Sequence, residues 1–173
     1  MTMNRSIGLM VALLVFLVDQ GTKIWVTSGL NLYYPGAEME LLPFFDLRYV
    51  ENRGVSLGFL EASSDTMRWA LVALTAAIAA GVAVWMWRER KLGDILALGL
   101  VLGGALGNIL DRSRLGFVVD FADFHIGEWR PFLVFNVADA AITIGVVILL
   151  ARALFVRDQP REPRPQVEKN VNA

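Results

Sequence analysis

The sequence Gly103-Gly104-Ala105-Leu106-Gly107-Asn108-Ile109-Leu110-Asp111-Arg112 decides the fold of this chain. It places an amide, a carboxylate and a guanidinium at the end of an apolar run that is long enough to cross a bilayer as a helix. Two further clusters follow, Val118-Val119-Asp120-Phe121 and Phe135-Asn136-Val137-Ala138-Asp139. Charged groups inside a membrane are costly, so they pair, face water or carry a function. These three clusters are therefore the candidate functional site.

Four apolar runs, at about 7–26, 67–87, 92–110 and 131–155, predict four transmembrane helices. The chain is 55% hydrophobic, above the roughly 45–50% of soluble domains. Its tryptophans lie at or beside the ends of these runs, where aromatic side chains meet the membrane–water interface: Trp25, Trp69, Trp85, Trp87 and Trp129. We expect an all-α polytopic membrane protein, with one four-span domain over residues 1–156 and a disordered tail over 157–173.

Lys and Arg in the loops predict the orientation of the spans. The short basic turn of Arg88, Arg90 and Lys91 and the basic tail lie on the same side as Arg5. Both termini are thus expected in the cytoplasm, and the two longer loops outside. A cleaved signal peptide is the alternative for the first run, but no small-residue cleavage site closely follows it. The net charge of −1 gives no case for nucleic acid, and the absence of Cys excludes disulfides and thiolate metal sites.

The first external segment contains one predicted strand. Apolar and polar side chains alternate over residues 45–51, after Pro43. Asn52-Arg53-Gly54 reads as a turn, and residues 55–60 as a partner strand. A small sheet on the membrane surface fits this pattern, with Asn52 as a possible turn former.

Small and polar residues form two rows on the third span. Gly99, Gly103 and Gly107 repeat every four residues and predict a smooth ridge against another helix. Gly104, Asn108 and Arg112 form the adjoining row; an interhelical hydrogen bond for Asn108 and an interfacial position for Arg112 are the alternatives to a functional role. Similarly, Asp19 and Lys23 share a helix face in the first span and can form an ion pair, either structural or functional.

The fourth span is expected to start at Pro131, a residue suited to the first turn of a helix. Asn136, Asp139 and Thr143 then form one polar stripe, which places Asp139 about two turns inside the span. Its carboxylate needs a partner on another element, and Asp120 is the best candidate. We interpret His125 as a solvated loop residue, and Asp123, Glu128 and Asp111 as residues that solvate their segments or, for Asp111, pair with a nearby Arg.

Two carboxylates at one membrane edge suit aspartic-type peptide hydrolysis, in which one ionised and one protonated carboxyl activate water. A proton or cation transporter is the main alternative. A transporter should carry polar residues down several spans, whereas the second run has no charge between Trp69 and Trp87. A non-catalytic assembly or lipid-binding protein would explain the glycine ridge but not the two acids.

The chain resembles the lipoprotein signal peptidases (signal peptidase II) from about Ile7 to Phe155. The resemblance lies in five blocks that occur in the family's order: residues 19–23 (DQGTK), 52–56 (NRGVS), 103–112, 119–121 (VDF) and 135–139 (FNVAD). Each block is weak evidence alone, but the five together on a four-span frame are specific. The family's small external β-cradle agrees with the alternation at residues 45–51.

The resemblance implies that Asp120 and Asp139 are a catalytic pair. It implies functional rather than purely structural roles for Asn52 and for the ion pair of Asp19 and Lys23. The full set of residues that it implies support the site or bind substrate is Asp19, Lys23, Asn52, Gly54, Gly104, Asn108, Arg112 and Asn136. The implied substrate is a prolipoprotein whose cysteine carries diacylglycerol, cut just before that cysteine without cofactor or metal. The implied protein lies in the bacterial inner membrane, surrounded by lipid, is active at its outer face and is inhibited by globomycin. We expect it to be a monomer.

Overall fold

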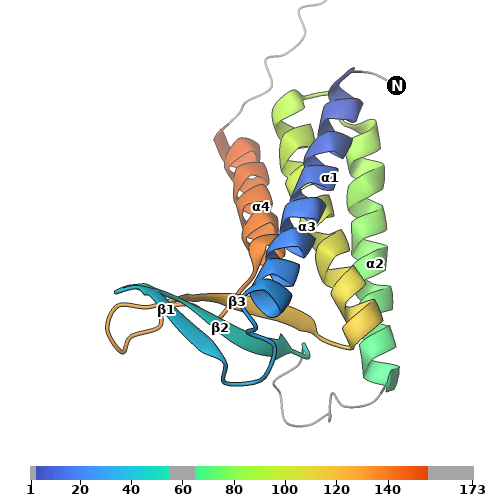
Figure 1. The fold of residues 1–173 in the computed structure, drawn as a ribbon. Helices are drawn as coiled ribbons and strands as arrows, with labels where there is room; N and C mark the ends of the chain where they lie inside the picture. The colour runs from blue at the N-terminus through green and yellow to red at the C-terminus, as the bar shows by residue number, and fades with distance from the viewer. Residues whose placement is uncertain (1–2, 55–64, 156–173) are drawn as a thin grey trace, which may run out of the picture.

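The computed structural model describes residues 3–54 and 65–155. Its helices are α1 (Met3–Ile24), which continues into a π-helical turn η1 (Trp25–Gly29), α2 (Asp65–Arg88), α3 (Leu92–Leu115) and α4 (Val137–Phe155). The start of α1 and the end of α4 lie at the end of the bundle opposite the sheet (Figure 1). The predicted tail lies outside the described residues.

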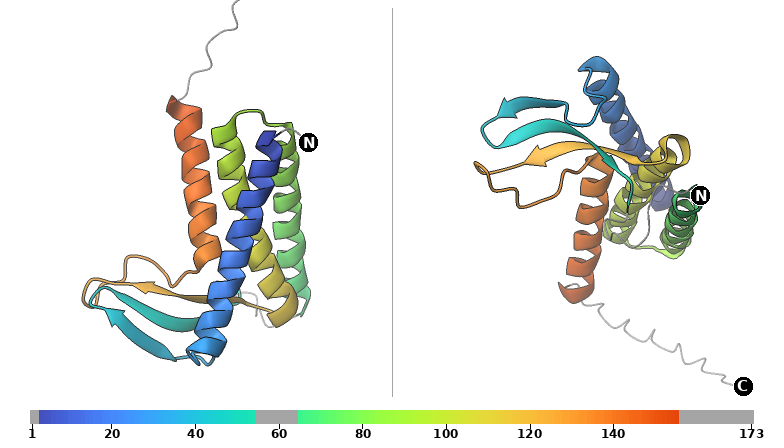
Figure 2. Two further views of the ribbon diagram at one scale, coloured as in Figure 1. Left: turned by 45° about the horizontal axis from the view of Figure 1, so that its top comes forward. Right: turned by 90° about the horizontal axis from the view of Figure 1, so that it is seen from below.

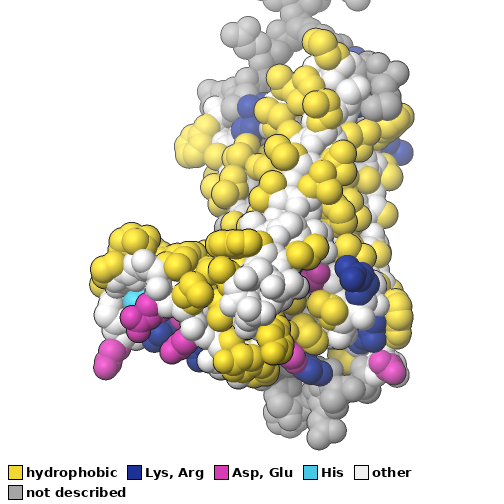
Figure 3. All heavy atoms as spheres, in the orientation of Figure 1, with side chains coloured by type: hydrophobic (Ala, Val, Ile, Leu, Met, Phe, Trp, Pro, Cys, Tyr) yellow, Lys and Arg dark blue, Asp and Glu magenta, His cyan; other side chains and the backbone are white. Residues whose placement is uncertain are grey.

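All four helices are long and apolar enough to cross a membrane, as predicted. Many of their large apolar side chains face outward; Met10 and Leu74, for example, are 68% and 58% exposed. Hydrophobic side chains cover the visible flanks of the helices, whereas most visible Asp and Glu side chains lie around the sheet and the helix ends beside it (Figure 3). This distribution suits helices in lipid and a sheet in contact with water.

Helix α3 packs against all three other helices. The predicted glycine ridge faces α1: a Cβ at Gly99 would lie 2.7 Å from the carbonyl oxygen of Gly8, and one at Gly103 would collide with that of Ala12. The adjoining row faces α4, where a Cβ at Gly104 would lie 2.5 Å from the carbonyl oxygen of Ala138. The missing side chains therefore let two helices approach α3 at backbone distance.

Three antiparallel strands form a small sheet in the order β1 (Glu38–Leu42), β2 (Phe45–Asn52) and β3 (Val118–Phe124). It projects to one side of the helix ends (Figure 2). The strand predicted at 45–51 is confirmed as β2. The partner strand predicted at 55–60 lies outside the described residues, and the observed neighbours of β2 are β1 and β3.

The predicted start of the fourth span at Pro131 is wrong, because α4 begins at Val137. The chain before α4 runs along β3 instead: the N–H of Phe135 donates to the carbonyl oxygen of Ala122 at 3.1 Å, and the N–H of Ala122 donates back at 2.8 Å. These bonds satisfy backbone groups that a longer helix would have satisfied internally. As a result Asp139 lies in the first turn of α4, not two turns inside it.

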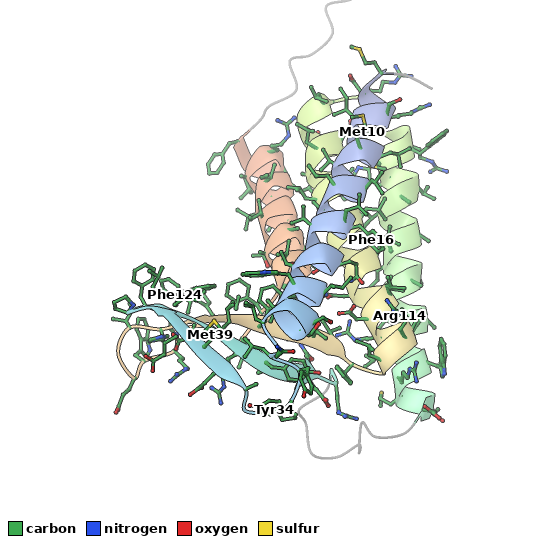
Figure 4. All side chains as sticks on the ribbon, viewed as in Figure 1. Met10, Phe16, Tyr34, Met39, Arg114 and Phe124 are labelled. Atoms are coloured by element: carbon green, nitrogen blue, oxygen red, sulfur yellow. The ribbon has the colours of Figure 1, made fainter. Side chains whose placement is uncertain are left out.

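Arg68, near the start of α2, closes the sheet end of α3. Its Nε donates to the carbonyl oxygen of Arg112 at 2.8 Å, and its Nη2 to that of Ser113. These carbonyls belong to the last turn of α3, where helical partners run out and a cation is favourable. Arg114 lies on the same turn (Figure 4). Arg68 thus fixes the end of the helix that carries Asn108 and Arg112.

We predict that Gly103→Ala lowers the free energy of unfolding by about 1–3 kcal/mol, because a Cβ there meets backbone and the Cβ of Val15 at 2.8 Å. Gly81→Ala on α2 is the matched control, since its Cβ would have nothing within 4 Å. That control should be neutral or gain up to about 1 kcal/mol of helix propensity. Unfolding of both variants in the same detergent measures the difference, and equal stabilities would contradict the packing role of the ridge.

Candidate active site

Asp120 and Asp139, which we call the carboxylate pair, meet where α4 starts against β3. Asp120 is 1% exposed and lies opposite Val50 in the β2–β3 register. Asp139 follows shortly after Phe135, the residue paired with β3. Two residues distant from each other in sequence are therefore placed together by a short backbone ladder.

Asn136 caps α4 and links the carboxylate pair. Its Oδ1 accepts the N–H of Asp139 at 2.9 Å, and its own N–H donates to Oδ2 of Asp139 at 3.3 Å. This reciprocal arrangement is a capping box. Because the amide oxygen is used by the cap, the amide nitrogen points the other way and donates to Oδ1 of Asp120 at 2.6 Å. A helix cap thereby becomes a bridge between the two carboxylates.

Asn52 supplies a second donor to Asp120, and, as in Asn136, its amide oxygen accepts a backbone N–H while its amide nitrogen faces the carboxylate. Its Oδ1 accepts the N–H of Gly54 at 3.0 Å, which leaves its Nδ2 to donate to Oδ2 of Asp120 at 2.9 Å. Gly54 has a φ of +103°, and a Cβ there would also lie 2.6 Å from Leu71. Glycine is therefore required to close the turn that orients Asn52.

Asn108 of α3 supplies a donor to Asp139. Lys23 donates to its Oδ1 at 3.3 Å, and Lys has only donors, so the Nδ2 of Asn108 faces Oδ1 of Asp139 at 2.8 Å. Each of the four oxygens in the carboxylate pair thus accepts one N–H and keeps a lone pair for water or a proton.

The burial of Asp120 raises its pKa from 3.8 to about 6. The hydrogen bond from Asn52 opposes this effect, the negative charge of Asp139 adds to it, and Asn136 and Lys23 again lower the pKa. The two carboxylates are therefore close enough to interact, and Asp120 binds a proton in a pH range where ordinary Asp side chains are ionised.

Lys23 is 4% exposed and pairs with Asp19 at 2.8 Å, so the predicted ion pair is present and buried. The guanidinium of Arg112 lies close enough for its charge to act on Asp139 and Asp120. Its Nε is buried without a hydrogen-bond partner among the described residues. The structure thus brings every predicted site residue to this end of the bundle, with Gly104 providing the close contact to α4.

Two residues at this end were assigned no site role from the sequence. Asp111 is 4% exposed, so the prediction that it solvates its segment or pairs with an Arg is wrong; it pairs with Lys23 at 2.8 Å. The sequence does contain a feature that indicates this position: Asp111 continues the four-residue spacing of Gly103 and Gly107, the row that faces α1. Gln20 donates to both Asp19 and Asp111. It lies in the block at residues 19–23, for which the resemblance implies a role only at the first and last positions.

The predictions for His125 and Asp123 as solvated residues are also wrong. Nε2 of His125 lies 2.9 Å from Oδ2 of Asp46. Asp123 is 1% exposed and accepts from Nε of Arg130 at 2.9 Å. The register pairs Asp46 with Asp123 across the strands, so two acids face each other there, and the basic side chains His125 and Arg130 lie against them. Glu128, in contrast, is exposed as predicted.

Two cavities flank this network. One, of about 610 Å³, has a mixed lining in which polar side chains such as Gln20, Lys23 and Asp111 lie beside apolar ones such as Ile24 and Phe117; we call it the polar cavity for the charged groups it reaches. An apolar recess of about 360 Å³ adjoins Asp139 and is lined by Phe132, Leu133, Phe135, Ala140, Thr143 and Ile144. Leu133, one of these lining residues, is 90% exposed. The carboxylate pair therefore lies near both a polar space and an apolar surface.

Comparisons with known proteins agree with this arrangement. Residues 11–155 match the family model of signal peptidase (SPase) II. The chain is 58% identical to a lipoprotein signal peptidase of Rhizorhabdus wittichii over 96% of both chains, and 53% identical to that of Sphingopyxis alaskensis over 93% of this chain and 94% of the relative. A solved bacterial membrane enzyme superposes with a TM-score of 0.75 at 29% identity, covering 88% of this chain and 95% of its own. The chain belongs to the signal peptidase II family.

Proposed function

We propose that this protein is an aspartic endopeptidase that removes the signal peptide from diacylglyceryl-modified prolipoproteins, cutting just before the lipidated cysteine. The observation that carries the proposal is the carboxylate pair, held by three asparagine amides at the sheet end of a membrane bundle. Membership of a family of lipoprotein signal peptidases supports the peptidase activity and the prolipoprotein substrate.

The chemistry follows from one proton shared by Asp120 and Asp139. The ionised carboxylate takes a proton from water as the water oxygen attacks the scissile carbonyl. The protonated carboxyl donates to the developing oxyanion, and a proton then passes to the leaving amine as the C–N bond breaks. The asparagine amides hold both carboxyls in place throughout. The pair titrates as a unit, so neither Asp is assigned permanently as base.

The substrate reaches the site from the membrane in this proposal. A signal peptide and two acyl chains prefer hydrocarbon, and the recess beside Asp139 is apolar. Lateral entry keeps the lipid out of water. Arg112, whose charge acts on Asp139 and Asp120, supports the site from α3, and Asp19, Lys23 and Gly104 support it from α1 and α3.

We place the active site outside the cytoplasm of a bacterial inner-membrane protein that acts as a monomer. Arg5, Arg88 and Arg90 lie on segments at the end of the bundle opposite the sheet, and Lys and Arg favour the cytoplasmic side. Both termini would then be cytoplasmic. A transporter is the second candidate class, but the described part of α2 has only Thr75 as a polar side chain between Trp69 and Trp87.

Asp120→Asn and Asp139→Asn should each abolish cleavage, with at least a thousand-fold loss, because an amide cannot exchange the shared proton. A gel-shift assay in detergent would compare diacylglyceryl-modified prolipoprotein with its unmodified form, with and without globomycin. Wild type should cut the lipidated form alone, and globomycin should block this cleavage. Asp123→Asn, an equally buried acid on the same strand, is the control and should retain activity. Full activity of either pair variant would refute the mechanism.

We expect kcat/KM to fall as pH rises through about 6, the pKa of Asp120. The sign follows from the raised pKa: below it the pair keeps its shared proton, and above it both carboxylates are ionised and the acid is lost. The fall should approach tenfold per pH unit in the free enzyme. A pH series with the lipidated substrate measures it, and a profile that stays flat from pH 5 to pH 8 would contradict the shared proton.

Chelators should leave activity unchanged. All four oxygens of the carboxylate pair accept N–H donors, and the proposed mechanism uses their remaining lone pairs for water and the shared proton, with no metal ion. Dialysis against EDTA followed by the cleavage assay tests this point. Loss of activity that added metal restores would count against the proposed mechanism.

A further inference from the structure

We propose that Asp19 and Asp111 form a second pair, the positioning pair, which fixes the separation of Asp120 and Asp139. Each acid accepts a hydrogen bond from the backbone N–H of the residue that immediately precedes one member of the carboxylate pair. Gln20 and Lys23 bridge the two acids. The catalytic meaning of this arrangement rests on the proposed function, whereas its geometry does not.

The first half of the arrangement joins α1 to α4. Oδ1 of Asp19 accepts the N–H of Ala138 at 3.0 Å, and Ala138 immediately precedes Asp139. Asp19 is fully buried, and Gly107 provides the space for its carboxylate because a Cβ there would collide with Oδ2. The first turn of α4 is thus held by a fixed acceptor from another helix.

The second half repeats this pattern on the strand. Oδ2 of Asp111 accepts the N–H of Val119 at 3.2 Å, and Val119 immediately precedes Asp120. Asp111 lies near the end of α3, the segment that Arg68 closes through the carbonyl of Arg112. The strand residue beside the carboxylate pair is therefore also held by a buried acid.

Two side chains of α1 join the halves. Nζ of Lys23 lies 2.8 Å from a carboxylate oxygen of Asp19 and 2.8 Å from one of Asp111. Nε2 of Gln20 donates to the same two acids, at 3.0 Å and 3.1 Å. Lys23 offers a charge and Gln20 a neutral donor, so one bridge can be changed without altering the local charge.

This arrangement explains why α1 contributes buried polar groups although neither member of the carboxylate pair lies on it. The two acids place α3, α4 and β3 relative to one helix, and that helix lies on the glycine ridge of α3. Reacting groups that shift by about 1 Å can lose 100-fold in rate. A structural ion pair would stabilise the fold equally well, so the test must separate turnover from stability.

The experiment uses the full-length protein in detergent with Asp111→Asn and Gln20→Met. Asp94→Asn is the control, because Asp94 is an acid of the same helix that pairs with Arg152 at 2.6 Å. Cleavage of lipidated prolipoprotein gives kcat and KM per folded enzyme. A titration followed by carboxyl ¹³C NMR gives the pKa of Asp120 without any need for activity.

We expect both test variants to lower kcat by about tenfold or more with KM within twofold, as misplacement of reacting groups predicts. Asp111→Asn should also lower the pKa of Asp120, because it removes a negative charge and leaves Lys23. The other charged groups around Asp120 remain, namely Asp19, Arg112 and Asp139. Gln20→Met should leave that pKa unchanged, and Asp94→Asn should change neither quantity.

Wild-type kcat in both variants, with the pKa of Asp120 unchanged, would overturn the proposal. If Asp111→Asn does not fold, Gln20→Met decides alone through kcat, since it keeps both acids and Lys23. If the wild-type protein cleaves no prolipoprotein, the proposed function fails; the NMR titration then still tests whether Asp111 acts on Asp120, and an unchanged pKa would overturn the inference as well.

Discussion

The ammonium of Lys23, buried between two carboxylates, is the interaction on which this end of the molecule depends. Burying one Asp would be costly, and here Asp19, Asp111 and Asp120 are all buried beside the half-buried Asp139, so the cluster requires compensation. Lys23 pairs directly with both Asp19 and Asp111, which offsets one of their two negative charges, and it orients the amide of Asn108 toward Asp139. Hydrogen bonds from backbone and asparagine N–H groups satisfy most of the remaining oxygens. This shared cation, together with the guanidinium of Arg112 near Asp139 and Asp120, therefore allows a dense acidic cluster to exist where helices meet a sheet.

The absence of side chains on α3 makes that cluster possible. Gly103 and Gly107 bring α1 close enough for the carboxylate of Asp19 to reach the backbone of α4, and Gly104 brings α4 itself into contact. In lipid, apolar side chains gain little by leaving hydrocarbon, so close backbone packing and interhelical hydrogen bonds must hold the helices together. The same row of positions that packs the bundle thus ends in the site, with Asp111 as its last member.

The sequence predicted features that depend on local periodicity. The four helices, the strand at β2 and the glycine ridge each repeat with a period that neighbouring residues reveal. Prediction from the sequence was wrong where pairing between distant segments determines the local structure. Strand β3 is buried on both faces and lacks clear alternation, and Pro131 suggested a helix start that pairing of Phe135 with Ala122 overrides. Asp111 was misread because its partners, Lys23 and Val119, lie on other elements.

The position of the carboxylate pair also explains how one site could bind a lipidated substrate and hydrolyse it with water. Hydrolysis consumes water, which hydrocarbon excludes, whereas an acylated peptide partitions into hydrocarbon. The polar cavity reaches Lys23 and Asp111, and the apolar recess reaches Asp139. The carboxylate pair lies between these two environments. A site deeper in the bundle would lack water, and one on the outer face of the sheet would lack contact with the lipid, so the junction of helices and sheet is where the proposed chemistry is feasible.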